Sequence, residues 1–228
     1  GHVITVRTAS TLMTSTDPAG SPIETAAGVV GPDATRAFKL LGSETRLAIL
    51  LALWEAYEPF SGDDAVAFSD LLERVDYDTS SNFSYHLEKL EGHFVESTDD
   101  GYRLRQAGHK IVRAVVAGAG ITETRLEPTE IGAECYVCGA PLEITYEGEH
   151  LYTVCSDCPG KFDPDGEKPP GTIMGFAFDP AGLSGRPPEE IFAAAIFRAM
   201  QKFKMQMGGL CPECSGPVEA GLAICEEH

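Results

Sequence analysis

Apolar residues recur at helical spacing between residues 43 and 75, and polar residues divide them into two segments. A helix is predicted to begin at Ser43, because the apolar positions i, i+3, i+4 and i+7 that follow it would form one buried face. These positions are Leu47, Leu50, Leu51 and Trp54. After a polar break at residues 61–64, a short helix is predicted over residues 69–75. Its inward positions are Leu71, Leu72 and Val75.

The next helix has one apolar and one polar face. Residues 76–79 are predicted to form a turn in which Asp78 caps a helix over residues 79–90. At about 100° per residue, the inward face of this helix consists of Phe83, Leu87 and Leu90. The opposite face is polar and mostly small, and it carries Ser81, Asn82, Ser84, Tyr85 and Lys89.

A hairpin is predicted directly after this helix. Residues 93–97 and 102–105 are short extended runs on either side of Asp99-Asp100-Gly101, and Asp-Gly between two such runs is a strong hairpin signal. Three helices followed by a hairpin predict a winged helix-turn-helix domain over residues 33–108. The third helix would be the recognition helix and the hairpin would be the wing.

The remainder of the chain predicts a small β-rich domain with one long helix, over residues 127–228. A short apolar helix at residues 109–119 lies in a linker or dimerisation segment (residues 109–126), and it packs either on a second subunit or on its own core. Strands are predicted within residues 142–154 and at residues 172–178, and a helix is predicted from Pro188 to about residue 207. The inward positions of that helix are Ile191, Phe192, Ala195, Ile196, Ala199 and Phe203. The fold class is therefore α+β.

Four cysteines have the spacing of a zinc ribbon. Cys135-x2-Cys138 and Cys155-x2-Cys158 are separated by 16 residues, which alternate as two strands around a turn at residues 147–149. A hairpin of this length brings the two pairs to one end, where four thiolates can surround a Zn²⁺ ion tetrahedrally. A disulfide is not expected in an intracellular regulator, and a redox centre would need a βαβ context. The C-terminal domain is thus predicted to be zinc-ribbon-like.

A second group, Cys211-x2-Cys214 and Cys225-x2-His228, has spacing that suits a Cys3His zinc site. One or two structural Zn²⁺ ions per chain are therefore predicted. Protein ligands would fill all four positions in each site, which leaves no place for a catalytic water. The sequence shows no Ser/His/Asp set and no nucleotide-binding loop, so no catalytic residues and no enzyme activity are expected.

The segments between residues 40 and 108 resemble a known family. "LLGSETRLAILLAL", "FSDLLERV", "SNFSYHLEKLEGHFVE" and "DGYRLRQAG" resemble the ArsR-like winged helix regulators of archaea and bacteria. The most specific pieces are Glu44-Thr45-Arg46-Leu47 and Ser84-Tyr85-His86-Leu87. Metal-sensing members carry cysteines on the helix before the recognition helix, whereas residues 69–75 contain none, so that sensing site is not carried over. With its cysteine-bearing C-terminal part, the whole chain is more similar to the haloarchaeal branch.

The charge of the chain does not by itself indicate DNA binding. The net charge is −18, and it divides into −1 for residues 1–32, −6 for residues 33–118 and −11 for residues 119–228. A basic surface is the usual mark of phosphate binding. However, 35 acidic residues against seven lysines is a halophilic balance, and in multimolar salt the screening length falls to about 3 Å. Repulsion from DNA then largely vanishes; alternatively, the domain binds a protein.

Residues 1–32 are rich in Thr, Ser, Ala, Gly and Pro, and they are predicted to form a flexible tail with a tag remnant at residues 1–2. No apolar run reaches the length of about 18 residues that a membrane-spanning helix needs. We therefore expect a soluble, cytoplasmic protein with no membrane partner.

These features together predict a sequence-specific transcription regulator that binds double-stranded DNA as a homodimer. The recognition helix would enter the major groove, and the residues that face base edges would be Ser81, Asn82, Ser84 and Tyr85. Phosphates or the minor groove would be contacted by Lys89, Arg103 and Arg105. The zinc-binding part would serve dimerisation, partner binding or effector sensing.

The alternative is an interaction module of the general transcription machinery, which also combines winged helices with zinc ribbons. A surface that docks a protein should show aromatic or aliphatic anchors. On the polar face of the recognition helix only Tyr85 is such a residue. The small polar side chains therefore favour DNA.

Overall fold

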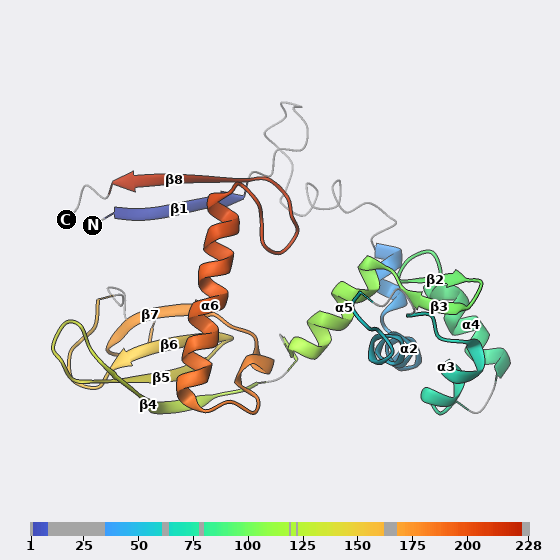
Figure 1. The fold of residues 1–228 in the computed structure, drawn as a ribbon, viewed down its shortest axis with the longest axis horizontal. Helices are drawn as coiled ribbons and strands as arrows, with labels where there is room; N and C mark the ends of the chain where they lie inside the picture. Colours follow the sequence, from blue (N-terminus) through green and yellow to red (C-terminus); the bar gives the residue numbers. More distant parts are fainter. Residues whose placement is uncertain are drawn as a thin grey trace. The chain divides into compact units, whose positions relative to one another are not determined.

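Helices and strands are divided between two units of the chain, each with a core of its own (Figure 1). The computed structural model describes residues 2–8, 35–60, 64–77, 80–118, 120–121, 123–161 and 168–224. The first unit ends at Val116, and the second unit begins at Ala117 and also includes the N-terminal strand. Helices and antiparallel strands occur in both parts of the fold, which confirms the predicted α+β class.

The first unit consists of helices and one hairpin. A short helical segment at residues 35–40 precedes the other elements, which are α2 (Glu44–Glu55), α3 (Phe68–Arg74), α4 (Ser80–Leu90), β2 (Val95–Thr98), β3 (Gly101–Leu104) and α5 (Gln106–Ala117). Strands β2 and β3 pair antiparallel, from Val95 opposite Leu104 to Thr98 opposite Gly101. Three helices and a hairpin thus follow one another in the predicted order. Asp78, the predicted cap, lies outside the described residues.

The buried face of α4 is the predicted one, whereas that of α2 agrees with the prediction only in part. In α4 the buried residues are Phe83, Leu87 and Leu90. In α2 they are Ile49, Leu50, Ala52 and Leu53, while Leu51 and Trp54 are only partly buried. Since α2 is apolar on nearly every side, spacing alone does not single out its inward face. Packing against α4 and β3 determines that face.

A short stretch before α3 pairs with the hairpin. The Val66 N–H donates to the Tyr102 carbonyl at 2.8 Å, and the Tyr102 N–H donates to the Val66 carbonyl at 2.9 Å. Next to this bridge, Gly101 has a φ of +139°, and a Cβ atom there would lie 2.3 Å from the Val66 oxygen. Both the backbone conformation and the close approach therefore require glycine.

We expect Gly101→Ala to destabilise the first unit by about 2–5 kcal/mol, because it combines backbone strain with steric overlap. Urea unfolding followed by circular dichroism measures this loss. Gly92→Ala is the control for strain alone, since Gly92 has a φ of +79° but a Cβ atom there would have no neighbouring atom within 4 Å. Equal losses in the two variants would show that the Val66 contact contributes nothing.

Helix α5 packs on the core of its own unit. Gly108, His109 and Val112 are buried, and a Cβ atom on Gly108 would lie 2.4 Å from the Phe94 carbonyl oxygen. The His109 ring meets Tyr57 edge to face, with 4.4 Å between the ring centroids. The sequence left open whether this helix packs on a second subunit or on its own core. Its inner face packs on its own core.

The second unit contains a four-stranded antiparallel sheet. In the order β4-β5-β6-β7, its strands are β4 (Leu126–Glu134), β5 (Pro141–Glu147), β6 (His150–Cys155) and β7 (Thr172–Ala177). Strands β5, β6 and β7 were predicted. Strand β4 was not, because Ile131 is its only buried residue and it has no clear apolar alternation. The Tyr146 hydroxyl, buried beneath the sheet, donates to the Phe178 carbonyl at 2.7 Å.

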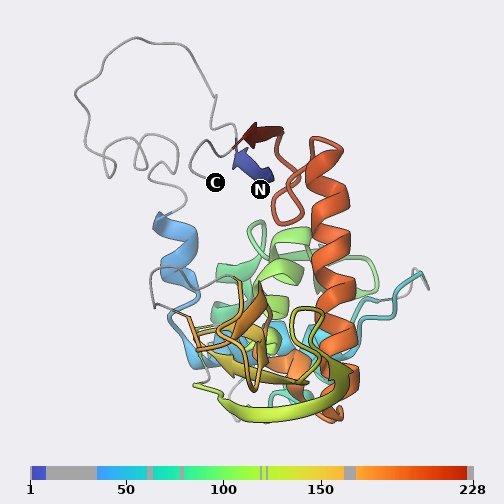
Figure 2. The same ribbon diagram turned by 90° about the vertical axis from the view of Figure 1, so that its left-hand side faces the viewer.

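Helix α6 (Pro188–Met207) covers the sheet with its N-terminal half only. Ile191 and Ala195 are buried there, close to the short 3₁₀ helix η1 (Pro180–Leu183). Figures 1 and 2 show the C-terminal half of α6 continuing past the sheet. Phe203 was predicted to face inward but is 44% exposed, because it lies in the half of α6 that extends past the four-stranded sheet. No helix in the described ranges is long and apolar enough to cross a lipid bilayer.

The N-terminal residues form a strand that was not predicted. Strand β1 (His2–Thr8) pairs antiparallel with β8 (Val218–Ile224), from His2 opposite Ile224 to Thr8 opposite Val218. For residues 2–8 the predicted flexible tail is therefore replaced by a strand. The segment HVITVRT is rich in β-branched residues, which favour strands, but the composition of residues 1–32 as a whole conceals this signal. The rest of the predicted tail lies outside the described residues.

Candidate metal centre and candidate nucleic-acid interface

The ends of the strands bring four cysteines together. Cys135 directly follows β4, and the chain returns into β5 at Pro141, which lies opposite Glu134. Leu142 of β5 lies opposite Cys155, the last residue of β6. This register places the Cys135–Cys138 turn beside the Cys155–Cys158 turn, as the 16-residue spacing predicted.

The four sulfur atoms have the separations of a tetrahedral thiolate site. Cys135 Sγ and Cys158 Sγ are 3.8 Å apart, and Cys138 Sγ and Cys155 Sγ are 3.5 Å apart. All four Sγ atoms lie within 4.8 Å of one another, and all four cysteines are free thiols. With metal–sulfur bonds of about 2.3 Å, a tetrahedral zinc site separates its sulfur atoms by about 3.8 Å. This group of cysteines could therefore hold a metal ion such as zinc.

Backbone N–H groups point at the sulfur atoms of Cys135 and Cys155. The Val137 N–H donates to Cys135 Sγ at 3.4 Å. The N–H groups of Asp157 and Cys158 both donate to Cys155 Sγ, each at 3.4 Å. Such donors favour the thiolate, which is the form of cysteine that binds metals.

The close approach of the four thiols makes a cation necessary for full ionisation. Hydrogen bonds from the backbone of Cys158 and Asp157 lower the pKa of Cys155 to about 6. The backbone of Ala140 favours the Cys138 thiolate, but contact with Cys155, burial and the other thiols outweigh it and raise the pKa of Cys138 to about 12. Binding of a metal ion by these thiols would therefore release protons at neutral pH, and a falling pH would weaken it.

Two of the four cysteines are part of the core of the sheet. Cys135 is 3% exposed and Cys155 is 6% exposed, and both belong to the same buried cluster as Ile173. Cys138 is exposed and Cys158 is half-buried. One side of the candidate centre is therefore continuous with the apolar interior, and the other side faces solvent.

The second predicted metal site is described only in part. Cys211 and Cys214 lie in the turn between α6 and β8, at half-buried and exposed positions. Cys225 and His228 lie outside the described residues. The predicted Cys3His set therefore remains a prediction.

Comparison with known proteins gives two family matches. Residues 34–115 match a family described as "Domain of unknown function (DUF7347)". Residues 132–228 match a family described as "Domain of unknown function (DUF7351)". The first match covers the helices and hairpin of the first unit, and the second covers all seven cysteines. A search of curated proteins found no match.

The polar face of α4 lies on the outside of the first unit. It consists of Ser81, Asn82, Ser84, Tyr85 and Lys89. Four of the five are exposed, and Ser84 is half-buried. The Ser84 hydroxyl donates to the Ser80 carbonyl at 3.0 Å, so its proton is used within the helix. The face is open to a partner.

Two contacts order the larger side chains of this face. Asn82 Nδ2 donates to the Tyr77 hydroxyl at 2.7 Å, which fixes the orientation of the amide. Lys89 Nζ lies 5.3 Å from the centroid of the Tyr85 ring, a distance at which a cation is attracted to the ring. The Asn82 carbonyl oxygen and the Lys89 charge both remain available for a ligand.

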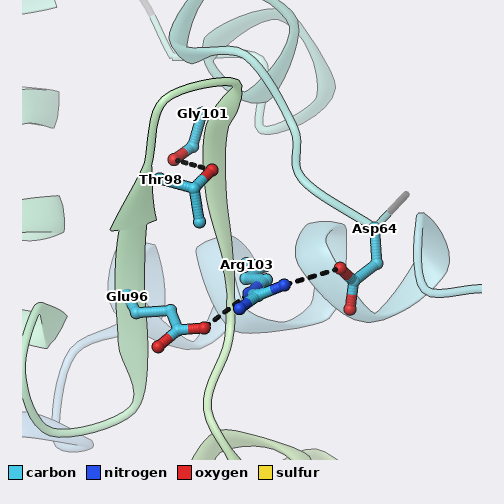
Figure 3. A network of polar contacts seen from close by, with 5 residues as sticks. All are labelled: Asp64, Glu96, Thr98, Gly101 and Arg103. Carbon is cyan, nitrogen blue, oxygen red and sulfur yellow. Dashed lines mark hydrogen bonds and ion pairs between the residues drawn. The ribbon is translucent and has the colours of Figure 1, made fainter. Parts of the chain in front are cut away.

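Arg103 in the hairpin and Arg105 directly after it both interact within the first unit. Arg103 Nε donates to Glu96 Oε1 at 2.5 Å, and an Arg103 terminal nitrogen lies 3.7 Å from Asp64 Oδ1. Figure 3 shows the guanidinium between these two carboxylates. Arg105 donates to the Gly92 carbonyl. A phosphate contact by either arginine would therefore use guanidinium N–H groups that these interactions leave free, or would replace the interactions.

His86 of α4 packs against neighbouring aromatic rings and carries no positive charge. Burial lowers the pKa of His86, and the nearby Arg46 lowers it further, so the ring is neutral at pH 7. Its centroid lies 5.6 Å from that of Tyr85 and 6.1 Å from that of Tyr77. The cations of this surface are therefore lysine and arginine.

The sequence analysis did not predict the residues that contact Arg103 and Asn82. Glu96 lies directly opposite Arg103 in the hairpin, so the expected register could have indicated this pair. Asp64 reaches Arg103 because Val66 pairs with β3, and no local pattern signals that pairing. Tyr77 lies in a turn, where its contact with Asn82 depends on how the turn is closed.

Proposed function

We propose that the chain is a sequence-specific DNA-binding transcription regulator whose first unit is a winged helix-turn-helix. The observation that carries this proposal is the division of α4 into two faces. Its apolar side fills the core, and its polar face exposes small hydrogen-bonding side chains. A helix of this kind suits the major groove, where Asn pairs with adenine and Ser adapts to several bases. Helices α3 and α4 would form the helix-turn-helix, and the β2–β3 hairpin would be the wing.

The four-cysteine centre supports a structural role for metal in this regulator. Thiolate ligands select soft or borderline cations, and a tetrahedral set of four is typical of Zn²⁺. We propose that Cys135, Cys138, Cys155 and Cys158 hold one Zn²⁺ ion. With four protein ligands the ion has no open position for a substrate or a water, so its contribution is to the fold of the second unit.

We further propose that the regulator acts as a homodimer. Exposed apolar residues along α6 from its middle to its C-terminal end support this, and they are Phe197, Met200, Phe203 and Met207. A two-fold pair of winged helices would place its recognition helices about 10 base pairs apart on the DNA.

An interaction module of the transcription machinery is the second candidate. Two observations favour it: residues 33–118 carry a net charge of −6, and Arg103 is already paired with Glu96 and Asp64. On this alternative, Tyr85, which is 54% exposed, would be the anchor for a protein surface.

Asn82→Ala and Lys89→Ala are expected to weaken DNA binding in different ways. Loss of a base contact by Asn82 should reduce affinity for the preferred site by about 1–3 kcal/mol, with little effect on random DNA. Loss of a phosphate contact by Lys89 should weaken binding to both DNAs and reduce the slope of log K against log salt by about one. Fluorescence anisotropy over a salt series, with the preferred site first selected from a random library, measures both effects.

Tyr77→Phe is the matched variant for the orientation of Asn82. It removes the hydroxyl that holds the amide and leaves Asn82 in place, so a smaller loss on the preferred site is expected. If Asn82→Ala and Lys89→Ala leave DNA affinity unchanged while Tyr85→Ala abolishes binding to RNA polymerase or a general factor, the interaction module takes the place of the DNA-binding regulator.

A further inference from the structure

The turn between α6 and β8 repeats the turn between β4 and β5 in sequence. Residues 135–143 are CYVCGAPLE, and residues 211–219 are CPECSGPVE. The two segments share both cysteines, the proline and the glutamate. At three of the other positions they have residues of similar size, which are Gly and Ser, Ala and Gly, and Leu and Val.

The backbone hydrogen bonds of the two turns also correspond. In the first turn, the N–H of Cys135 donates to the carbonyl five residues later at 2.8 Å, and the N–H four residues later donates back to the Cys135 carbonyl at 2.8 Å. In the second turn, the Cys211 N–H donates to the Gly216 carbonyl at 2.8 Å, and the Ser215 N–H donates back to the Cys211 carbonyl at 2.9 Å. The second turn is therefore a structural copy of the first.

Backbone conformation and strand pairing extend the correspondence. Ser215 has a φ of +63°, where the first turn has Gly139 with a φ of +82°. A residue with a side chain rarely adopts this conformation, so the second turn keeps its shape where the sequence does not favour it. Pro217 lies opposite Leu210 in the same way that Pro141 lies opposite Glu134.

The sulfur atoms of the second turn have the surroundings of metal ligands. The N–H groups of Cys214 and Glu213 donate to the Cys211 sulfur, which the Cys214 thiol also contacts. Cys155 in the four-cysteine centre receives N–H groups from the same relative positions, two and three residues later. The Glu213 carboxylate is held by Lys202 of α6 at 2.6 Å.

We propose that Cys211 and Cys214 form one half of a second metal site, which binds Zn²⁺ or another thiophilic divalent cation separately from the four-cysteine centre. Cys214 is exposed and Cys211 half-buried, so two further ligands can approach from solvent. In the described ranges no third ligating side chain joins this pair. The remaining ligands are therefore to be sought outside the described ranges, where the sequence offers Cys225 and His228, or in a second copy. This site does not depend on the proposed DNA binding.

Metal content of the full chain, purified without chelator, tests the proposal. Elemental analysis should give two ions per chain, or three per dimer if two copies share the second site. The double variant C211S/C214S should lose the ion of the second site and keep that of the four-cysteine centre. Its matched counterpart C135S/C138S should lose the ion of the four-cysteine centre and keep that of the second site. Loss of the second ion from a monomeric C225S/H228A variant would assign the missing ligands to the same chain, whereas a dimer that dissociates on chelation would assign them to a second copy.

Alkylation of Cys214 gives a readout that does not require a folded C135S/C138S variant. Iodoacetamide labelling of the wild-type chain, followed by peptide mass spectrometry, should show slow modification of Cys214 before chelation and fast modification after it. One ion per chain in the wild type, unchanged in C211S/C214S, together with equal labelling of Cys214 in both conditions, would overturn the proposal.

Discussion

Replacing Cys135 with serine is expected to remove the metal from the four-cysteine centre and to unfold the sheet of the second unit. Cys135 is 3% exposed and lies in the same buried cluster as Leu142 and Ile173, so loss of the ligand opens the core itself. Structural zinc contributes on the order of 10 kcal/mol to small domains that depend on it. Since a whole domain is stable by only about 5–15 kcal/mol, little of the cooperative transition should remain. Elemental analysis and thermal unfolding by circular dichroism measure the two losses.

Val137→Ala is the matched control for this experiment. Val137 lies between two of the cysteines and is 47% exposed. Its replacement keeps all four thiols and the N–H that contacts Cys135, so stability should change by no more than about 0.5 kcal/mol. Acidification should reproduce the effect of Cys135→Ser, because protons compete with the metal for the thiolates. A sheet that melts at the same temperature with and without chelator would rule out the structural role of the metal.

Phe83→Ala is expected to destabilise the first unit by about 3–5 kcal/mol, because it leaves a cavity at the centre of the core. Phe83 is completely buried, and its ring centroid lies 5.5 Å from that of Phe68 and 5.8 Å from that of Tyr77. The aromatic side chain thus joins α4 to α3 and to the turn between them. Urea denaturation of the variant and the wild type gives the difference in free energy of unfolding.

Tyr85→Ala removes an aromatic ring from the opposite side of the same helix. Tyr85 is 54% exposed, so this change should leave the free energy of unfolding within about 0.5 kcal/mol and affect only binding. Metal content should be normal in both variants. Equal destabilisation by the two replacements would mean that the two faces of α4 are not separated as described.

Local patterns predicted the helices, the hairpin and three strands of the sheet, but they did not predict strands β1, β4 and β8. The two-faced composition of α4 and the Asp-Gly turn of the hairpin indicated their structures correctly. The inward face of α2 was predicted only in part, because a helix that is apolar on nearly all sides contains no directional signal: Leu50 is buried as expected, but so are Ile49 and Leu53. Strand β4 was missed for the opposite reason: it buries only Ile131 and forms because β5 offers it an edge.

The candidate metal centre was predictable because cysteine spacing is a strong local signal. Two pairs at x2 spacing, with a hairpin between them, leave few arrangements of the four thiols other than the one found. The contacts of Arg103 were not predictable in the same way, since Asp64 and Glu96 lie 39 and 7 residues away in the sequence. Long-range pairing, here through Val66 and Tyr102, decides which charges meet.

The separation of the two cores also has a consequence for how this chain can change over generations. One core contains side chains from Ile49 to Val112, and the other contains side chains from Ile131 to Ala195. The family matches divide in the same way, ending at residue 115 and resuming at residue 132. We therefore expect the two halves to be joined most easily, in a recombinant chain, between the end of α5 at Ala117 and the start of β4 at Leu126.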